Sequence, residues 1–522
     1  MGYDIKYKMD ILIKKVISCF NYTVVLIPII MSICFALVYI LGGWGNIIDN
    51  HMVDFYFLKS IDISGKLITI VVFWFVLIIF LTFLVWKIGE KVKKKEIKIL
   101  TTPICIFIIA LFIRFLLLYI YNNNLVPFSD FYFVWQLANG NLEAGKMDYY
   151  SLFPAYLNFS LYEHIIIKLF GDRYIVVLYL NAIYSALTGG CIYFICREIR
   201  NNEVLSIFAG ILYALYPSNI IYITTGTPDF IAILFNTIGV FLLLKGYKNE
   251  KYGNKYLMVF GGGMALGVGG SFKTFSIVIM IAFGIIIFIN IIIERKNKEV
   301  KVLMLSFIML VIMLIGYKGV SDIVLNYTAN YYGMELSTDK STPQYILIGL
   351  NTESEGQIHI GTLSRLYNQE YLSNGMDYEA AKSYAYGLLK EDWKNNREEI
   401  VPNFIKKMIW AWQDDYTPVR YFLNNVKINQ DSTSETLIYD IFLQYGSGFT
   451  QMSYMLVLML VLVSMISNIK NKMQLPYEYI TLIIFGYFCM IFLSEGQSRY
   501  KCLVMPYLII ITALVKTKKM NE

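Results

Sequence analysis

Charged side chains are scarce in this chain: lysine, arginine, aspartate and glutamate together make up only 16% of its 522 residues. Soluble domains carry nearer a quarter, so the composition excludes an ordinary soluble protein. Hydrophobic residues make up 57% of the chain. Many windows of about 20 residues are almost wholly apolar, which is long enough to cross a hydrocarbon core of about 30 Å. We therefore expect a multi-pass membrane protein.

Cysteine and histidine are also few. All seven cysteines lie in or beside apolar runs and none lies in the longest polar loop, which excludes a disulfide framework. The three histidines are scattered without metal-ligand spacing, so neither a metal nor another cofactor is expected. A divalent ion held by carboxylates alone stays open. The basic start lacks a small-residue cleavage site, so the first apolar run is expected to be retained as a span.

About twelve apolar runs have the length of a membrane-spanning helix. They cover residues 16–42, 66–87, 101–121, 174–196, 204–223, 228–246, 256–270, 274–293, 301–320, 451–468, 476–494 and 502–516. The runs predict an all-α membrane protein, a bundle of about twelve transmembrane helices.

The basic residues predict how these spans are oriented. Lysine and arginine cluster at 6–15, 87–98, 197–200, 245–255, 295–301, 470–472 and 516–519, and loops of this kind remain in the cytoplasm. The clusters account for the net charge of +7 without a nucleic-acid-binding patch. The intervening loops are nearly free of positive charge and are expected outside. Both termini would then be cytoplasmic, in a plasma (inner) membrane.

Two polar segments are expected on the outer side. The segment 122–173 contains the amphipathic stretch FPAYLNFSLYEHIIIKLFG, which fits a juxtamembrane helix lying along the bilayer surface. The segment 321–450 is the only sizeable soluble region, and it is expected to form helices that break near Pro402. The chain then divides into two additional spans in 1–100, a transmembrane core in 101–320, an extracytoplasmic cap in 321–450 and C-terminal spans in 451–522.

Asp130, in PFSDFYFVWQLANG, is the first candidate catalytic residue. It follows a span at the outer face, where a carboxylate can act as a general base. The alternative is a helix N-cap, with Ser129 or Asp130 satisfying free backbone amides. Tyr132 and Gln136 are four residues apart and share a helical face, so they are candidate substrate-binding residues.

Lys273 and Arg499 lie at the outer ends of spans, in GGSFKTFSIV and LSEGQSRYKCLVMPY. Basic residues at span ends usually snorkel to the interface, but on the cytoplasmic side. Two cations outside suit an anionic headgroup such as phosphate. Arg114 lies within the third span, where a guanidinium needs a partner. It can pair with an acid such as Asp229 or reach the same phosphate.

Two further acids are expected on the outer face. Asp229 follows Pro228 at the start of a span, where a helix N-terminus accounts for a carboxylate equally well. Glu495 can pair with Arg499 across one helical turn.

Four stretches together resemble the GT-C glycosyltransferases, in particular the bacterial branch grouped with protein O-mannosyltransferases and aminoarabinose transferases. They are SDFYFVWQLANG, FPAYLNFSLYEHIIIKLFGDRYIVVLYLN, GGGMALGVGGSFKTFSI and SEGQSRYKCLVMPYLIIITALV. The stretch ILIGLNTESEGQI is also similar to an outer loop of that branch. The resemblance covers roughly residues 100–516, and the order and common outer placement of the stretches carry it.

The resemblance implies a GT-C-type bundle with Asp130 as the catalytic aspartate, Lys273 where an arginine is usual, and Glu495, Arg499 and Tyr500 in the final motif. It implies a polyprenyl-phosphate sugar as donor and a hydroxyl of a glycan, lipid or protein as acceptor. Two departures stand out. Asp229 takes a place often held by glutamate, and Phe131 stands where the protein mannosyltransferases carry a second acidic residue.

Two other functions are compatible with the composition. A flippase or transporter of lipid-linked saccharide would place charged or broken helices near the midplane and often contains repeats, whereas here the polar groups lie at the outer ends. A polysaccharide polymerase or ligase would share the setting and differ mainly in using a diphospholipid donor.

Overall fold

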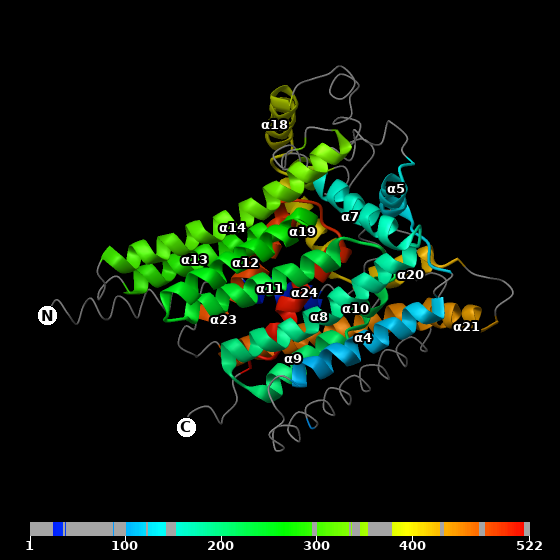
Figure 1. The fold of residues 1–522 in the computed structure, drawn as a ribbon, viewed down its shortest axis with the longest axis horizontal. Coiled ribbons are helices and arrows are strands. Elements are labelled where there is room, and N and C mark those ends of the chain that lie inside the picture. The colour runs from blue at the N-terminus through cyan, green and yellow to red at the C-terminus, as the bar shows by residue number, and fades with distance from the viewer. Residues whose placement is uncertain are drawn as a thin grey trace.

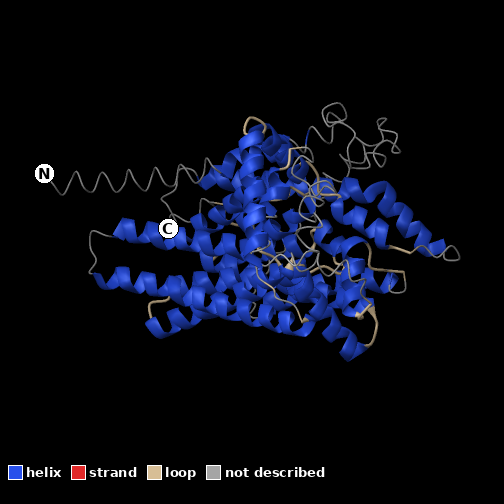
Figure 2. Ribbon diagram, turned by 90° about the horizontal axis from the view of Figure 1, so that it is seen from above, coloured by secondary structure: helices blue, strands red, loops and turns tan. Residues whose placement is uncertain are grey.

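The computed structural model describes residues 25–34, 37, 87, 101–121, 124–141, 153–294, 300–333, 336, 345–352, 378–427, 433–468 and 475–515. Among these residues the regular structure is helical, with one isolated antiparallel bridge between Leu125 and Val426 (Figure 2). The prediction of an all-α protein is confirmed.

The helices follow one another along the chain (Figure 1). In order they are α4 (Thr101–Tyr121), α5 (Ser129–Ala138), α7 (Pro154–Phe170), α8 (Tyr174–Arg200), α9 (Glu203–Ala214), α10 (Pro217–Tyr222), α11 (Asp229–Lys248), α12 (Tyr252–Phe272), α13 (Ser276–Glu294), α14 (Val300–Tyr332), α18 (Tyr378–Asn395), α19 (Ile400–Trp412), α20 (Thr417–Asn425), α21 (Thr433–Ile441), the π-helix η2 (Phe442–Gly446), α22 (Ser447–Asn468), α23 (Leu475–Leu493), the 3₁₀-helix η3 (Ser498–Tyr500) and α24 (Lys501–Thr512).

Six of the described helices are long and apolar enough to cross a membrane: α4, α8, α11, α14, α22 and α23. The shorter apolar helices Val25–Cys34, Glu203–Ala214 and Ser276–Ile291 accompany them. The chain is therefore a multi-pass membrane protein. Of the two expected N-terminal spans, 16–42 is described only in part, and 66–86 lies outside the described residues.

Two of the predicted boundaries are wrong. The segment 204–223 is two helices, because Pro217 has no N–H and cannot continue α9. Tyr216, the residue before it, adopts an extended conformation. The helix expected over 301–320 continues as α14 to Tyr332, so the polar segment after it begins twelve residues later than hydropathy indicated.

Close packing between helices depends on small residues at the contacts. A Cβ atom on Gly267 of α12 would lie 2.6 Å from the Tyr317 carbonyl oxygen of α14, and one on Gly263 would collide with the Met313 carbonyl oxygen. Glycine at these two positions lets the two backbones touch.

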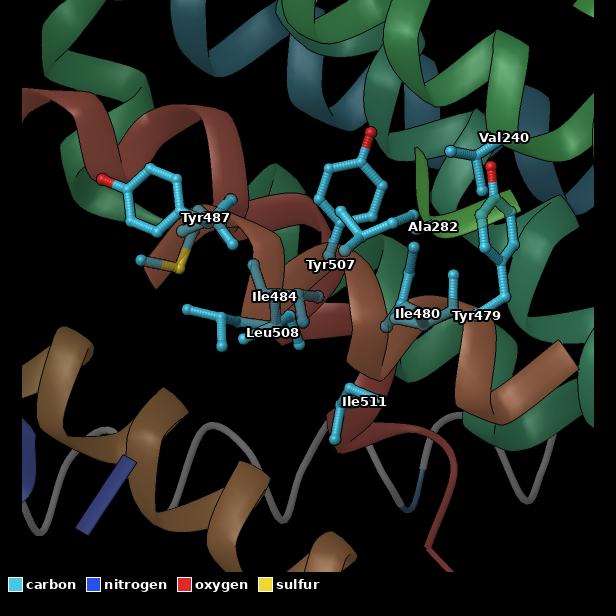
Figure 3. Close-up of a cluster of buried hydrophobic side chains, with 14 of the residues drawn as sticks. Val240, Ala282, Tyr479, Ile480, Ile484, Tyr487, Tyr507, Leu508 and Ile511 are labelled. Carbon is cyan, nitrogen blue, oxygen red and sulfur yellow. The ribbon is translucent and has the colours of Figure 1, made fainter. Parts of the chain in front are cut away.

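The largest buried cluster lies between α11, α13, α23 and α24. Figure 3 shows its aliphatic and tyrosine side chains interleaved, with Tyr479 and Tyr487 from α23 and Tyr507 from α24. The shorter helices α5, α7 and α20 lie on the right of Figure 1. Most of the predicted site residues lie around these short helices.

Candidate active site

Six predicted residues form a cluster, namely Asp130, Asp229, Lys273, Glu495, Arg499 and Tyr500. We call it the outer cluster, after the side of the membrane that the sequence predicts for it. They come from five separate segments: α5, the start of α11, the end of α12, the 495–497 turn and η3. Tyrosines from α7, α10 and α20 connect them. The sequence separation between Asp130 and Arg499 is therefore closed by tertiary structure.

Asp130 lies in the first turn of α5 and is half-buried. The Tyr156 hydroxyl of α7 donates to its Oδ2 at 3.4 Å. The N-cap of α5 is Phe128, which makes no side-chain cap hydrogen bond. The N-cap alternative for Ser129 and Asp130 is therefore wrong. Ser129 instead has φ of 52°, a left-handed conformation that non-glycine residues rarely adopt and that recurs at active sites.

Asp229 is 2% exposed and is held by three groups. The Lys273 ammonium lies 3.2 Å from its Oδ1. The hydroxyls of Tyr222 and Thr227 donate to its Oδ2 at 2.7 and 2.9 Å. The carboxylate thus neutralises Lys273 and anchors it at the end of α12.

Arg499 is 9% exposed and sits between two aromatic rings. Its guanidinium carbon lies 5.0 Å from the centre of the Tyr500 ring and 5.9 Å from that of Tyr421. Nη1 donates to the Tyr421 hydroxyl at 3.0 Å and Nη2 to the Tyr500 hydroxyl at 3.2 Å. Nε is buried and has no hydrogen-bond partner in the described part of the chain. A buried guanidinium donor in this state is suited to binding an oxyanion.

Glu495 is linked to Arg499 through Tyr500, whose hydroxyl donates to Glu495 Oε2 at 2.7 Å. Residues 495–497 are not helical, so the expectation that one helical turn separates Glu495 and Arg499 is wrong. The Lys273 ammonium also lies 5.2 Å from the centre of the Tyr500 ring. Tyr500 thus contacts both cations, Lys273 and Arg499, and also Glu495.

The charges of Asp130 and Arg499 both affect the pKa of Tyr421. Burial raises the pKa of Tyr421, the Arg499 charge opposes this effect, and the Asp130 charge adds to it. Arg499 is also within electrostatic range of Tyr156, which bonds Asp130. The outer cluster therefore combines two cations with the buried acids Asp229 and Glu495 and the half-buried Asp130. This pairing can accept a proton on one side and compensate a leaving anion on the other.

Arg114 does not join the outer cluster. Its Nη1 donates to the carbonyl oxygens of Ala110 and Ala214 at 3.0 and 2.9 Å, and its Nε donates to Ser185 at 3.0 Å. Ala214 is the last residue of α9, so Arg114 satisfies a carbonyl left free where Pro217 breaks the helix. The hypothesis that Arg114 pairs with Asp229 is wrong, since Asp229 is bound by Lys273.

Tyr132 and Gln136 also lie apart from the cluster. The Tyr132 side chain is 44% exposed and packs on Phe133, and Gln136 accepts a hydrogen bond from Asn141. Two helical positions correspond to a rotation of about 200°, so Tyr132 and Asp130 face opposite sides of α5. Their role in substrate binding stays a prediction.

A buried polar network beside the site was not predicted. Asp415 accepts hydrogen bonds from Tyr216 and Ser218, next to the break before α10. Lys501 donates to the carbonyl oxygens of Ala411 and Asp414 and lies 4.0 Å from Asp415 Oδ1. Burial raises the pKa of Asp414 to about 6 against the opposing charge of Lys501. The aspartate pair after the apolar run IWAW was the available signal.

Lys407 of α19 ties the cap to the final motif. Its ammonium donates to the carbonyl oxygens of Gly349 and Phe492 at 2.7 and 2.9 Å. Burial lowers its pKa to about 7, and the charge of Glu495 partly offsets this effect. Gly349 lies in the stretch ILIGLNTESEGQI, and a Cβ there would collide with the Leu493 carbonyl oxygen. Gly349 therefore packs directly against the segment that leads to Glu495.

A segment of the helical bundle is similar to a known family of membrane transferases. Residues 159–317, from α7 into α14, match a family model described as dolichyl-phosphate-mannose-protein mannosyltransferase. The match confirms the resemblance to the GT-C glycosyltransferase superfamily over these residues, which make up less than half of the chain. The matched segment contains Asp229 and Lys273. No curated protein matches the chain significantly.

Proposed function

We propose that the protein transfers a sugar from a polyprenyl-phosphate donor to a hydroxyl of a glycan, lipid or protein at the outer face of the membrane. The observation that carries this proposal is the outer cluster, which contains the half-buried carboxylate of Asp130 together with the cations Lys273 and Arg499. The family match supports the donor class, since dolichyl phosphate in its description is a polyprenyl phosphate.

Asp130 is the general base of the proposed reaction. The acceptor hydroxyl must lose its proton as it attacks the anomeric carbon, and a carboxylate within hydrogen-bond reach can take that proton. Partial exposure of Asp130 leaves room for an acceptor to reach it. A single displacement of this kind inverts the configuration at the anomeric carbon.

Lys273 and Arg499 compensate the charge of the leaving phosphate. A phosphate is already a weak base, so it needs no general acid, and one carboxylate suffices where glycosidases use two. Cations fixed before the reaction stabilise the charge that develops on the leaving oxygen. The unpartnered Nε of Arg499 is a donor available for this role among the described contacts.

The proposal also predicts which parts of the chain lie on which side of the membrane. The lipid tail of the donor lies between spans, the acceptor approaches under the 321–450 segment, and both termini are cytoplasmic. A cysteine introduced at exposed Glu398 should react with an impermeant maleimide from outside, whereas one at Asn254 should not. The opposite labelling pattern would place the outer cluster in the cytoplasm and refute the proposal.

Lipid-linked sugars and surface glycans can be compared by mass spectrometry in cells that carry the gene, lack it or carry Asp130→Asn. We expect a monophospholipid sugar to accumulate in both deficient strains and one glycan modification to disappear. Accumulation of a diphospholipid oligosaccharide would instead indicate a polymerase or ligase. Unchanged lipids and glycans would refute a transferase of this donor class.

A further inference from the structure

Helix α20 of the cap is fixed to the loop that carries Asp130. Leu125 and Val426 form an antiparallel bridge. The Val126 amide donates to the Asn425 carbonyl at 3.0 Å, and the Lys427 amide donates to the Asn124 carbonyl at 2.6 Å. A short strand-like pairing therefore joins the C-terminal end of α20 to the segment just before Asp130.

The same helix also contacts the turn before Asp229 and the 3₁₀-helix η3, which carries Arg499. The Asn425 side chain donates to the Thr224 carbonyl at 2.8 Å, in the turn that leads to Asp229. The Thr417 hydroxyl, at the other end of α20, hydrogen-bonds that of Ser498, next to Arg499. Helix α20 thus spans the site from the base to the cations.

Tyr421 is the point at which these contacts meet. Its hydroxyl accepts a hydrogen bond from Arg499 Nη1 at 3.0 Å. Its ring lies 5.2 Å from that of Phe128, two residues before Asp130. The opposite neighbour is Tyr222, stacked at 6.0 Å with an interplanar angle of 21°, whose hydroxyl binds Asp229.

Packing alone does not account for Tyr421. The core face of α20 is formed by Val419 and Phe422, which are 1% and 0% exposed. Phe422 packs on Tyr121 and Phe442. Tyr421 is half-buried on another side of the helix, and its hydroxyl engages the one guanidinium of the outer cluster.

We propose that Tyr421 is a positioning residue through which the cap holds Arg499 ready for the donor phosphate. The inference rests on the proposed function, since it assigns Arg499 to the phosphate. A long arginine side chain loses much conformational freedom when it binds a ligand, and fixing it beforehand reduces that cost. The hydroxyl accepts from Arg499 and keeps its own hydrogen, which it can donate to a phosphate oxygen.

The test compares Tyr421→Phe with wild type, using purified full-length protein in nanodiscs and polyprenyl phosphate as the ligand. Phenylalanine keeps the ring and removes only the hydroxyl. We expect about tenfold weaker binding, as for the loss of one hydrogen bond to a charged group. The KM for the acceptor should not change, and the thermal midpoint should fall by about as much as in Tyr332→Phe. Tyr332→Phe is the matched control, because it removes a half-buried hydroxyl that bonds Ser160 at 2.9 Å.

A second variant tests whether Tyr421 acts through Arg499. In an Arg499→Lys background the flat, two-armed donor is gone, so Tyr421→Phe should weaken binding less than it does in wild type. Equal effects in both backgrounds, or unchanged binding in Tyr421→Phe, would overturn the inference.

The same measurements separate this inference from the proposed function. Wild-type protein that binds polyprenyl phosphate but transfers no sugar would refute the proposed function. The binding measurements on Tyr421→Phe would still test the role of Tyr421 in that case. Wild-type protein that neither binds polyprenyl phosphate nor transfers sugar would overturn both.

Discussion

Replacement of Asp130 by asparagine should separate its chemical role from its structural one. Asparagine keeps the shape of the side chain but cannot take a proton as a carboxylate base does. We expect transfer to fall about a hundredfold or more. This loss corresponds to about 2.7 kcal/mol in the activation free energy.

The structural cost of the same change should be smaller. Asp130 lies in the first turn of α5 but is not its cap, so its interaction with the helix dipole contributes about 0.3–1 kcal/mol. Its contact with the Tyr156 hydroxyl is long, at 3.4 Å. The thermal midpoint and the binding of polyprenyl phosphate should therefore stay close to those of wild type.

The assay is transfer from a defined polyprenyl-phosphate sugar, followed together with thermal unfolding of the purified protein. Asp172→Asn is the matched control, since Asp172 is an exposed aspartate of the same outer region and accepts a hydrogen bond from Asn139. It should retain normal activity. Activity of Asp130→Asn close to that of wild type would refute the mechanism and direct the search for a base to Asp229 or Glu495.

Three further outcomes follow from the contacts of Lys273, Arg114 and Lys407. Lys273→Ala should abolish donor use and lower the thermal midpoint, because it leaves the Asp229 carboxylate charged, buried and without its ion-pair partner. Adding Asp229→Asn to this variant should restore the midpoint but not sugar transfer. Recovery of transfer in the double variant would refute a role of Lys273 in binding the phosphate. Arg114→Met should lower stability by about 1–3 kcal/mol, by freeing the Ala214 carbonyl, and leave the donor KM unchanged. Burial lowers the folded-state pKa of Lys407 to about 7, so between about pH 7 and pH 10 the unfolded chain binds more protons than the folded one. As the pH increases through this range, the thermal midpoint of wild type should therefore rise relative to that of Lys407→Met. A midpoint difference independent of pH would contradict this assignment.

Membrane helices were the most predictable part of the fold. Most predicted spans match a described helix within a few residues, as for 101–121 and α4 or 476–494 and α23. The reason is that each span must satisfy its own backbone hydrogen bonds within the bilayer, so local hydropathy decides it. The errors fall at Pro217, where local backbone chemistry ended a helix, and at α14, which continues into polar sequence.

The outer cluster was predictable residue by residue, but not as a connected site. Lys273 and Arg499 are visible in the sequence because they lie at span ends predicted to be outside, where basic residues are unusual. Their linkage depends on tyrosines such as Tyr222, Tyr421 and Tyr500. In a chain with 42 tyrosines, residue type alone does not distinguish these from the others.

The sequence by itself determined the helical membrane class, the main spans and which polar residues lie near span ends, because these follow from local hydrophobicity and charge. Only the tertiary structure decided which of the buried and half-buried cations belong to the outer cluster. Arg114, Lys407 and Lys501 satisfy backbone carbonyl groups, whereas Lys273 and Arg499 meet acidic and aromatic side chains of the outer cluster. A cation buried in a low-dielectric interior binds whichever oxygen the packing brings to it, and that partner comes from a distant segment of the chain.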